Sequence, residues 1–166
     1  MNFIKKMKKT ILILAIILGI NANSQDKRFT FYGYSDPNAT IQDGFNIGFG
    51  IEYQMENIYI KTQIFAFPNL RGKDYFEWST IPFTSFNKHL LFDDLRLYTG
   101  FKLGLIKRDV IHPFIGFESG IDYYFDNKFY IGLICSEDLR TDGKEWENDI
   151  PNYWRFSGFI KIGFQW

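Results

Sequence analysis

The 166-residue sequence contains a single cysteine and two histidines, and its basic and acidic residues balance at 19 each. One cysteine excludes a disulfide framework and a cysteine-rich zinc site. The absence of a basic excess argues against a nucleic-acid-binding protein. After residue 24, no apolar run is long enough to cross a bilayer as a helix. Aromatic residues, in contrast, make up 20% of the chain, which excludes a disordered protein.

The first 24 residues have the features of a secretory signal peptide. Four lysines between residues 5 and 9 precede the apolar stretch 10–20, which is shorter than the roughly 20 residues needed to span a bilayer. Ala22 and Ser24 then supply the small residues of a signal-peptidase site. We therefore predict a cleaved signal peptide over residues 1–24 and one exported domain over residues 25–166. An uncleaved N-terminal anchor is the alternative.

From Gly44 onward, large apolar residues alternate with glycine and polar residues, which is the period of a β-strand. Segments 95–105 and 153–166 show the pattern at greatest length, and short polar segments at 54–57 and 125–127 fit hairpin turns. In the fourth strand, Pro82 marks either a bulge or the end of the strand, because proline cannot donate a ladder hydrogen bond. The eight predicted strands are 28–34, 44–53, 58–67, 75–86, 94–106, 110–124, 128–136 and 153–166.

The composition of the less apolar face indicates which way the strands point. It is rich in glycine, which suits the crowded interior of a small barrel better than a face in contact with water. It also carries charges of both signs, which an interior tolerates only in pairs. We expect Arg96 and Lys102 to meet Glu118 and Asp122. The predicted lumenal charge network comprises Glu52, Lys61, Arg96, Lys102, Glu118, Asp122, Arg155 and Lys161.

The signal peptide, the eight alternating strands and the end of the last strand together resemble a known family. Ile160, Ile162, Phe164 and Trp166 alternate up to a terminal aromatic residue. This pattern resembles the small (OmpA- and OmpX-like) outer-membrane β-barrel proteins of Gram-negative bacteria. The resemblance implies an all-β fold, an antiparallel up-and-down eight-stranded transmembrane β-barrel in the cell outer membrane. It also implies that these four residues are the signal read by the barrel-assembly machinery, and that the barrel is a monomer in contact with outer-membrane lipids and lipopolysaccharide.

An eight-stranded barrel has an interior just wide enough for its own side chains, so we expect no general pore. The function that remains is a structural or surface-interaction role through extracellular loops. The long acidic segment 137–152 is the candidate surface-interaction loop, although the sequence does not identify its partner. Its candidate residues are Asp138, Asp142, Glu145, Trp146, Glu147 and Asp149.

Two other functions share some of these features. A soluble exported barrel that binds a small apolar ligand would show the same alternation with its apolar face inward. An outer-membrane lipid-modifying enzyme could use Asp109 and His112 at the outer rim. That class needs a serine close to the histidine, and the sequence contains no His-x-Ser motif. We therefore predict no enzyme activity, no catalytic residue, no cofactor and no metal site.

Overall fold

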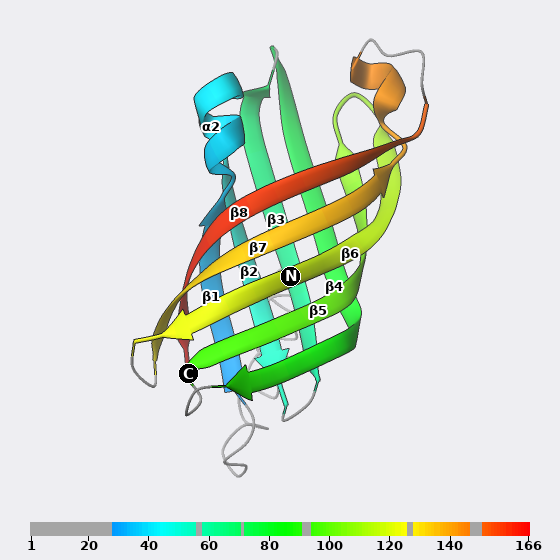
Figure 1. The fold of residues 1–166 in the computed structure, drawn as a ribbon. Coiled ribbons are helices and arrows are strands. Elements are labelled where there is room, and N and C mark those ends of the chain that lie inside the picture. The colour runs from blue at the N-terminus through cyan, green and yellow to red at the C-terminus, as the bar shows by residue number, and fades with distance from the viewer. Residues whose placement is uncertain (1–27, 56–57, 71, 91–93, 126–127, 147–150) are drawn as a thin grey trace, which may run out of the picture.

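The computed structural model describes residues 28–55, 58–70, 72–90, 94–125, 128–146 and 151–166. The predicted signal peptide lies outside these residues. Eight antiparallel strands, each paired with its neighbours along the chain, close into a barrel where β1 pairs with β8 (Figure 1). The predicted up-and-down eight-stranded barrel is thus confirmed. The strands are β1 (Arg28–Ser35), β2 (Ile47–Gln54), β3 (Tyr59–Leu70), β4 (Lys73–Leu90), β5 (Leu95–Lys107), β6 (Ile111–Tyr124), β7 (Phe129–Arg140) and β8 (Tyr153–Gln165).

Two short helices, α2 (Pro37–Asp43) and η2 (Gly143–Trp146), lie at one end of the barrel (Figure 1). At the other end, Phe29 and Trp166 exchange backbone hydrogen bonds of 3.1 and 2.7 Å. Helix α2 lies between the first two strands, where the sequence pattern predicts only a connection. The Asp36 side chain caps this helix by accepting a hydrogen bond from the Ala39 backbone N–H (2.9 Å), and Pro37 follows it at the helix start. An Asp-Pro pair is a recognised helix-start signal. Among the described residues, no helix has the length and apolar character needed to cross a membrane.

Strands β4 and β7 extend beyond their predicted bounds. β4 runs from Lys73 to Leu90, and its register against β5 shifts between Thr80 and Phe83, so Pro82 lies in a bulge. β7 continues to Arg140 rather than ending at residue 136. The first part of the predicted acidic loop is therefore strand.

The two faces of the strands have the orientation that the sequence predicted. Large apolar side chains such as Phe49, Leu133 and Ile162 point outward and are more than half exposed. Charged side chains such as Glu52 and Arg96 point inward and are fully buried. This arrangement is the reverse of a soluble barrel, in which the apolar face lies inside.

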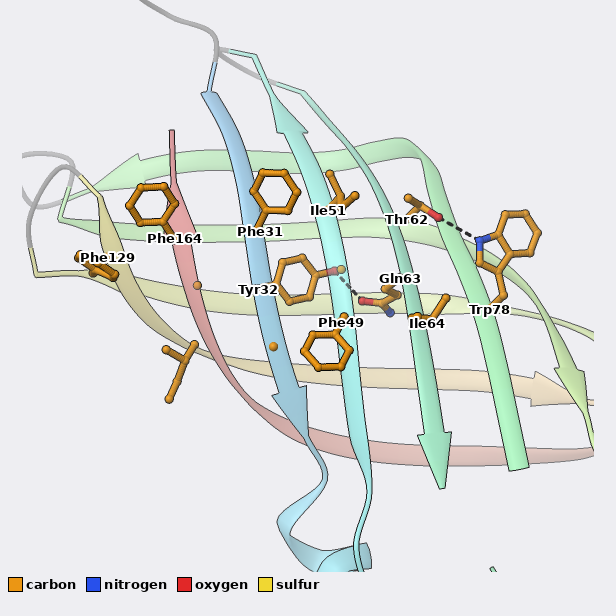
Figure 2. Close-up of a pocket in the computed structure, with 14 residues that line it drawn as sticks. Phe31, Tyr32, Phe49, Ile51, Thr62, Gln63, Ile64, Trp78, Phe129 and Phe164 are labelled. Atoms are coloured by element: carbon orange, nitrogen blue, oxygen red, sulfur yellow. Dashed lines mark hydrogen bonds between the residues drawn. The ribbon is translucent and has the colours of Figure 1, made fainter. Parts of the chain in front are cut away.

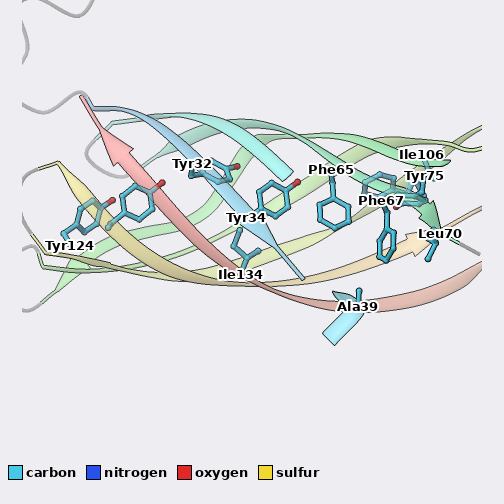
Figure 3. Packing of buried hydrophobic residues seen from close by; sticks show 12 residues of the cluster. Tyr32, Tyr34, Ala39, Phe65, Phe67, Leu70, Tyr75, Ile106, Tyr124 and Ile134 are labelled. Atoms are coloured by element: carbon cyan, nitrogen blue, oxygen red, sulfur yellow. The ribbon is translucent and has the colours of Figure 1, made fainter. Parts of the chain in front are cut away.

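Interior glycines lie opposite large interior side chains of the neighbouring strand. Gly50 pairs with Tyr32, and Gly120 pairs with Tyr98. A Cβ atom at either glycine would overlap the opposing ring. Figure 3 shows the consequence along the inside of the barrel, where the rings of Tyr32, Tyr34, Phe65 and Phe67 follow one another in a continuous row. Glycine thus provides the space that lets aromatic rings fill a narrow interior.

This packing predicts that Gly120→Ala destabilises the barrel by about 1–3 kcal/mol, because the added methyl group must displace the buried ring of Tyr98. Gly33→Ala is the matched control. Gly33 faces outward, and the nearest atom to an added Cβ would be the Gly48 carbonyl oxygen at 3.8 Å, an ordinary contact. Urea unfolding of both variants in lipid vesicles measures the difference. Equal stability of the two variants would contradict this account of the interior.

Candidate functional site

The barrel interior contains most of the charged residues that the sequence singled out. Arg155 faces the same side as the others but is only half-buried. It lies opposite Asp138 in the β7–β8 ladder and makes no ion pair with another residue that the structure describes. The predicted residues that the structure buries in the interior are Glu52, Lys61, Arg96, Lys102, Glu118, Asp122 and Lys161.

Arg96 is the centre of the charge cluster nearer the chain termini. Its guanidinium nitrogens lie 2.5 Å from Glu52 Oε1 and 3.0 Å from Asp122 Oδ2. The other oxygen of Asp122 lies 2.6 Å from Lys161 Nζ. The side-chain oxygen of Asn87 accepts a hydrogen bond from Arg96 Nε at 2.7 Å. Two acids therefore balance two cations in this cluster, and a guanidinium suits the centre because it donates in several directions at once.

A second ion pair joins Lys61 of β3 to Glu118 of β6 across the interior. Gln63 donates a 2.9 Å hydrogen bond to the other oxygen of Glu118. The Tyr32 hydroxyl in turn donates to the Gln63 side-chain oxygen at 2.8 Å. The carboxylate is thus satisfied on both oxygens, as a buried charge requires.

A third group lies toward the end of the barrel that carries the helices. Lys102 Nζ lies 3.2 Å from both Glu77 Oε1 and Asp138 Oδ2. The expectation that Lys102 meets Glu118 or Asp122 is therefore wrong. The strand register explains this difference. The residue of β6 directly opposite Lys102 is Gly116, and the residue of β7 directly opposite Gly116 is Asp138. Because Gly116 has no side chain, Lys102 extends over it to reach Asp138.

Two residues assigned to the surface-interaction loop belong to this interior group instead. Asp138 is 3% exposed, and Asp142 is fully buried against Arg140, whose Nε lies 3.3 Å from Asp142 Oδ1. The prediction that both face solvent is wrong. The two-residue alternation of the strand continues through Ser136, Asp138 and Arg140 and so indicates that these residues face the interior. The charges of Asp138 and Arg140 nevertheless favoured a loop.

The remaining residues of the predicted loop have other positions. Glu145 and Trp146 belong to η2. Glu147 and Asp149 lie outside the described residues. Glu77 and Arg140 are also buried in the interior, although Arg140 falls within the segment 137–152 that the sequence predicted as an exposed loop, and Arg140 hydrogen-bonds the Tyr75 hydroxyl.

Three residues of the predicted assembly signal lie on the outward face of β8, and the fourth, Trp166, directly follows the strand. Ile160, Ile162 and Trp166 are exposed, and Phe164 is half-buried. Ile162 and Phe164 also line an apolar groove of about 670 Å³ on the outside of the barrel. Figure 2 shows its other walls on β1 to β4, where Trp78 donates a 3.1 Å hydrogen bond to Thr62.

Of the two residues proposed for an enzyme, Asp109 lies in the connection before β6 and His112 is the second residue of that strand. Asp109 forms an ion pair with Lys73. A hydrogen bond from Lys73, together with its positive charge, lowers the pKa of the Asp109 carboxyl below its ordinary value. His89 packs against the ring of Tyr124, with ring centroids 5.9 Å apart. Within the described residues, no three of the His, Cys, Asp and Glu side chains are grouped closely enough to hold a metal ion.

Together these features define a closed antiparallel eight-stranded barrel with an apolar exterior and an ion-paired interior. No family model and no curated protein matches the chain. Among solved structures, Neisserial surface protein A (NspA) is 12% identical, with a TM-score of 0.49 over 84% of this chain and 93% of that one. The N-terminal β-barrel domain of OprF from Pseudomonas aeruginosa is 13% identical, with a TM-score of 0.47 over 86% and 98%. The outer membrane protein Ail of Yersinia pestis is 12% identical, with a TM-score of 0.49 over 86% and 100%. At these values the likenesses add no functional argument, and the architecture stands on the strand pairing of this chain.

The pairing of Lys61 with Glu118 predicts strong coupling in a double-mutant cycle. Lys61→Met alone leaves a buried carboxylate without its cation and should cost about 3–5 kcal/mol. Adding Glu118→Gln removes the orphaned charge and should recover much of that loss. The stabilities are measured by urea unfolding in lipid vesicles.

The exposed pair Lys73–Asp109 serves as the control for this cycle. Its side chains are 46% and 64% exposed, so Lys73→Met and Asp109→Asn should show no measurable coupling. Additive costs at Lys61 and Glu118 would show that the interior pair contributes no interaction of its own.

Proposed function

We propose that the chain is an integral outer-membrane β-barrel whose interior is filled by its own side chains. Its role is structural, or is a surface interaction made at the end that carries α2 and η2. The observation that carries the proposal is the combination of an apolar exterior on every strand with charges paired inside. Lipid solvates such an exterior, whereas in water it would form one continuous apolar surface.

The geometry of the strands supports a membrane location. A tilted strand needs about 9–11 residues to cross the hydrocarbon. Strands β3 to β8 have 12 to 18 residues, so they can cross it and continue beyond it. Closure of the barrel through the β1–β8 ladder removes the two free edges that an open sheet would have along these paired residues, as spanning a bilayer with β-structure requires.

Aromatic residues on the outward face gather near both ends of the barrel. Phe125, Phe129 and Trp166 lie near the end with the chain termini. Trp154 and Phe156 lie near the end with the helices. Aromatic girdles at two levels are typical of barrels that contact the headgroup regions of both leaflets.

The filled interior supports the absence of a general pore. Arg96 and Lys102 each bridge acids from two different strands, and Lys161 pairs with Asp122, so passage of a solute would have to separate buried ion pairs. The same interior argues against a lipocalin-like binder of apolar ligands. The apolar groove that includes Phe31 and Phe49 lies on the outside of the strands.

The proposed partners follow from these surfaces. The outward face would contact outer-membrane lipids, including lipopolysaccharide in the outer leaflet. Ile160, Ile162, Phe164 and Trp166 would be read by the barrel-assembly machinery before the barrel closes.

Fractionation of bacteria that express the chain tests the membrane proposal. The protein should sediment with the outer membrane, and Phe101→Arg should cost about 2–4 kcal/mol of stability in lipid vesicles because it places a charge at mid-barrel. Ile111→Arg, at the end of β6, should cost about 0–1 kcal/mol. A protein that stays in the aqueous fraction and tolerates Phe101→Arg would show that the proposed location is wrong.

Protease treatment of intact cells tests the topology. Lys144 lies exposed in η2, whereas Arg140 is buried in β7, so trypsin should cut after Lys144 and leave Arg140 uncut. Lys144→Gln is the control and should abolish this cleavage. Cleavage only after the outer membrane is permeabilised would place the helix-bearing end in the periplasm.

A further inference from the structure

The half of β8 near the helices is paired on one side only. Its ladder with β7 is continuous from Tyr153 to Phe164. Its ladder with β1 ends where Ile160 pairs with Ser35. Figure 1 shows β8 leading away from β1 and α2 toward η2 over this stretch. In the part of the chain that the structure describes, residues 153–159 have no strand partner on the β1 side.

The backbone groups on this free edge can be assigned. Trp166 both donates to and accepts from Phe29 of β1, so its N–H and C=O face β1. Alternate residues of a strand direct these groups to the same edge. The N–H and C=O groups of Gly158, Phe156 and Trp154 therefore face the free edge, whereas those of Ser157 and Arg155 face β7.

The sequence explains why β1 stops short. Continuing the register beyond Ser35 would place Pro37 opposite Gly158. Pro37 has no N–H to donate and begins α2. Ala39 of α2 belongs to the buried cluster against which Phe159 packs, but no backbone hydrogen bond joins α2 to β8 among the described residues.

The burial of side chains along β8 also changes where the pairing with β1 ends. The inward-facing Lys161 and Gly163, which have neighbours on both sides, are buried. The inward-facing Arg155, Ser157 and Phe159, beside the free edge, are half-buried. On the outward face beside them, Phe156 is 73% exposed, the highest value on this strand among the large apolar side chains.

The free edge reaches the depth of the outer leaflet if the chain spans the membrane as proposed. From Phe164 to Phe156 the strand rises about 19 Å along the membrane normal, at about 3.3 Å per residue and a tilt near 45°. The apolar band of such a barrel is about 25 Å tall. Unpaired backbone groups at this depth are strongly unfavourable because lipid tails cannot hydrogen-bond them. A partner that supplies backbone groups is therefore favoured over lipid.

We propose that residues 154–158 of β8 form a strand-addition site for an extended segment of another polypeptide. This proposal names the contact site for the proposed surface interaction and rests on that role. Main-chain hydrogen bonds to Trp154, Phe156 and Gly158 would provide the binding, and side chains would provide the selectivity. Residues facing Trp154 and Phe156 would be apolar. The residue beside Arg155, a half-buried cation that also lies within electrostatic range of Glu77, would be acidic.

A second copy of this chain does not fit the site. Two copies with the same orientation in one membrane are related by an axis along the membrane normal. That rotation would cross two strands tilted by about 45° at roughly 90°, so their edges could not pair. The occupant is therefore a different polypeptide segment.

Amide hydrogen exchange on the full barrel in lipid nanodiscs tests the proposal, with a capped nine-residue peptide of alternating valine and glutamate as the probe. Without the peptide, the amide of Trp154, the edge residue nearest the headgroup water, should exchange fast, while those of Arg155 and Ser157 are protected by β7. The peptide should slow exchange at Trp154. A peptide of the same sequence with N-methylated backbone nitrogens on its pairing edge should not.

Two pairs of variants make the test specific. Phe156→Pro removes one edge N–H without removing a ladder hydrogen bond to β7, and should abolish peptide binding. Phe156→Ile keeps that N–H and should retain binding. Arg155→Glu should reverse the preference, so that a valine–lysine peptide binds in place of the valine–glutamate peptide. Protection of β6 and β7 amides in every variant confirms that the barrel is folded.

Protection of the Trp154 amide without peptide would overturn the proposal, because headgroup water reaches this residue and protection would mean that the edge is already closed. Equal binding of the methylated and unmethylated peptides would also overturn it, because apolar adsorption would explain both. Failure of the membrane proposal is recognised separately, by fractionation of the folded barrel into the aqueous phase. The exchange experiment can then be repeated in detergent-free buffer.

Discussion

Most of the buried charges that the structure describes inside this barrel are paired with residues of other strands. Arg96 of β5 joins Glu52 of β2 to Asp122 of β6, and Asp122 also holds Lys161 of β8. A slip of one residue in any ladder would turn a strand's charges outward and its large apolar side chains inward. Both changes are unfavourable in a lipid-solvated barrel. The ion pairs and the alternating faces therefore specify the same register, and the closed fold depends on that agreement.

The narrow interior imposes a second constraint, which glycine meets in two ways. Opposite Tyr98, Gly120 leaves room for a ring. Opposite Lys102, Gly116 leaves a path over which the lysine reaches Asp138. A side chain at either position would compete for a volume that is already filled. Glycine on the inner face thus serves both the packing of rings and the pairing of charges.

The sequence was sufficient to predict the strand number, the closed topology and the face that points outward, because all three follow from a two-residue period over long segments. It did not predict the partners of Lys102, which depend on how rows of residues align around a closed barrel. It also assigned Asp138 and Asp142 to a loop, because acidic residues near a strand end resemble solvent-exposed positions when their cations lie on distant strands. Helix α2 was missed although Asp36 and Pro37 carried its signal.

The early end of β1 at Ser35 has a consequence for how the barrel forms. The β1–β8 ladder, from Thr30 with Gln165 to Ser35 with Ile160, is the shortest of the eight in the described part of the chain, and it joins residues at opposite ends of the sequence. Contacts of such long sequence separation carry the largest loop-closure entropy and form slowly. Strands β2 to β7 can pair as successive hairpins before the β1–β8 ladder forms. Assembly is thus a directional process that ends at the seam, and local opening on heating begins there.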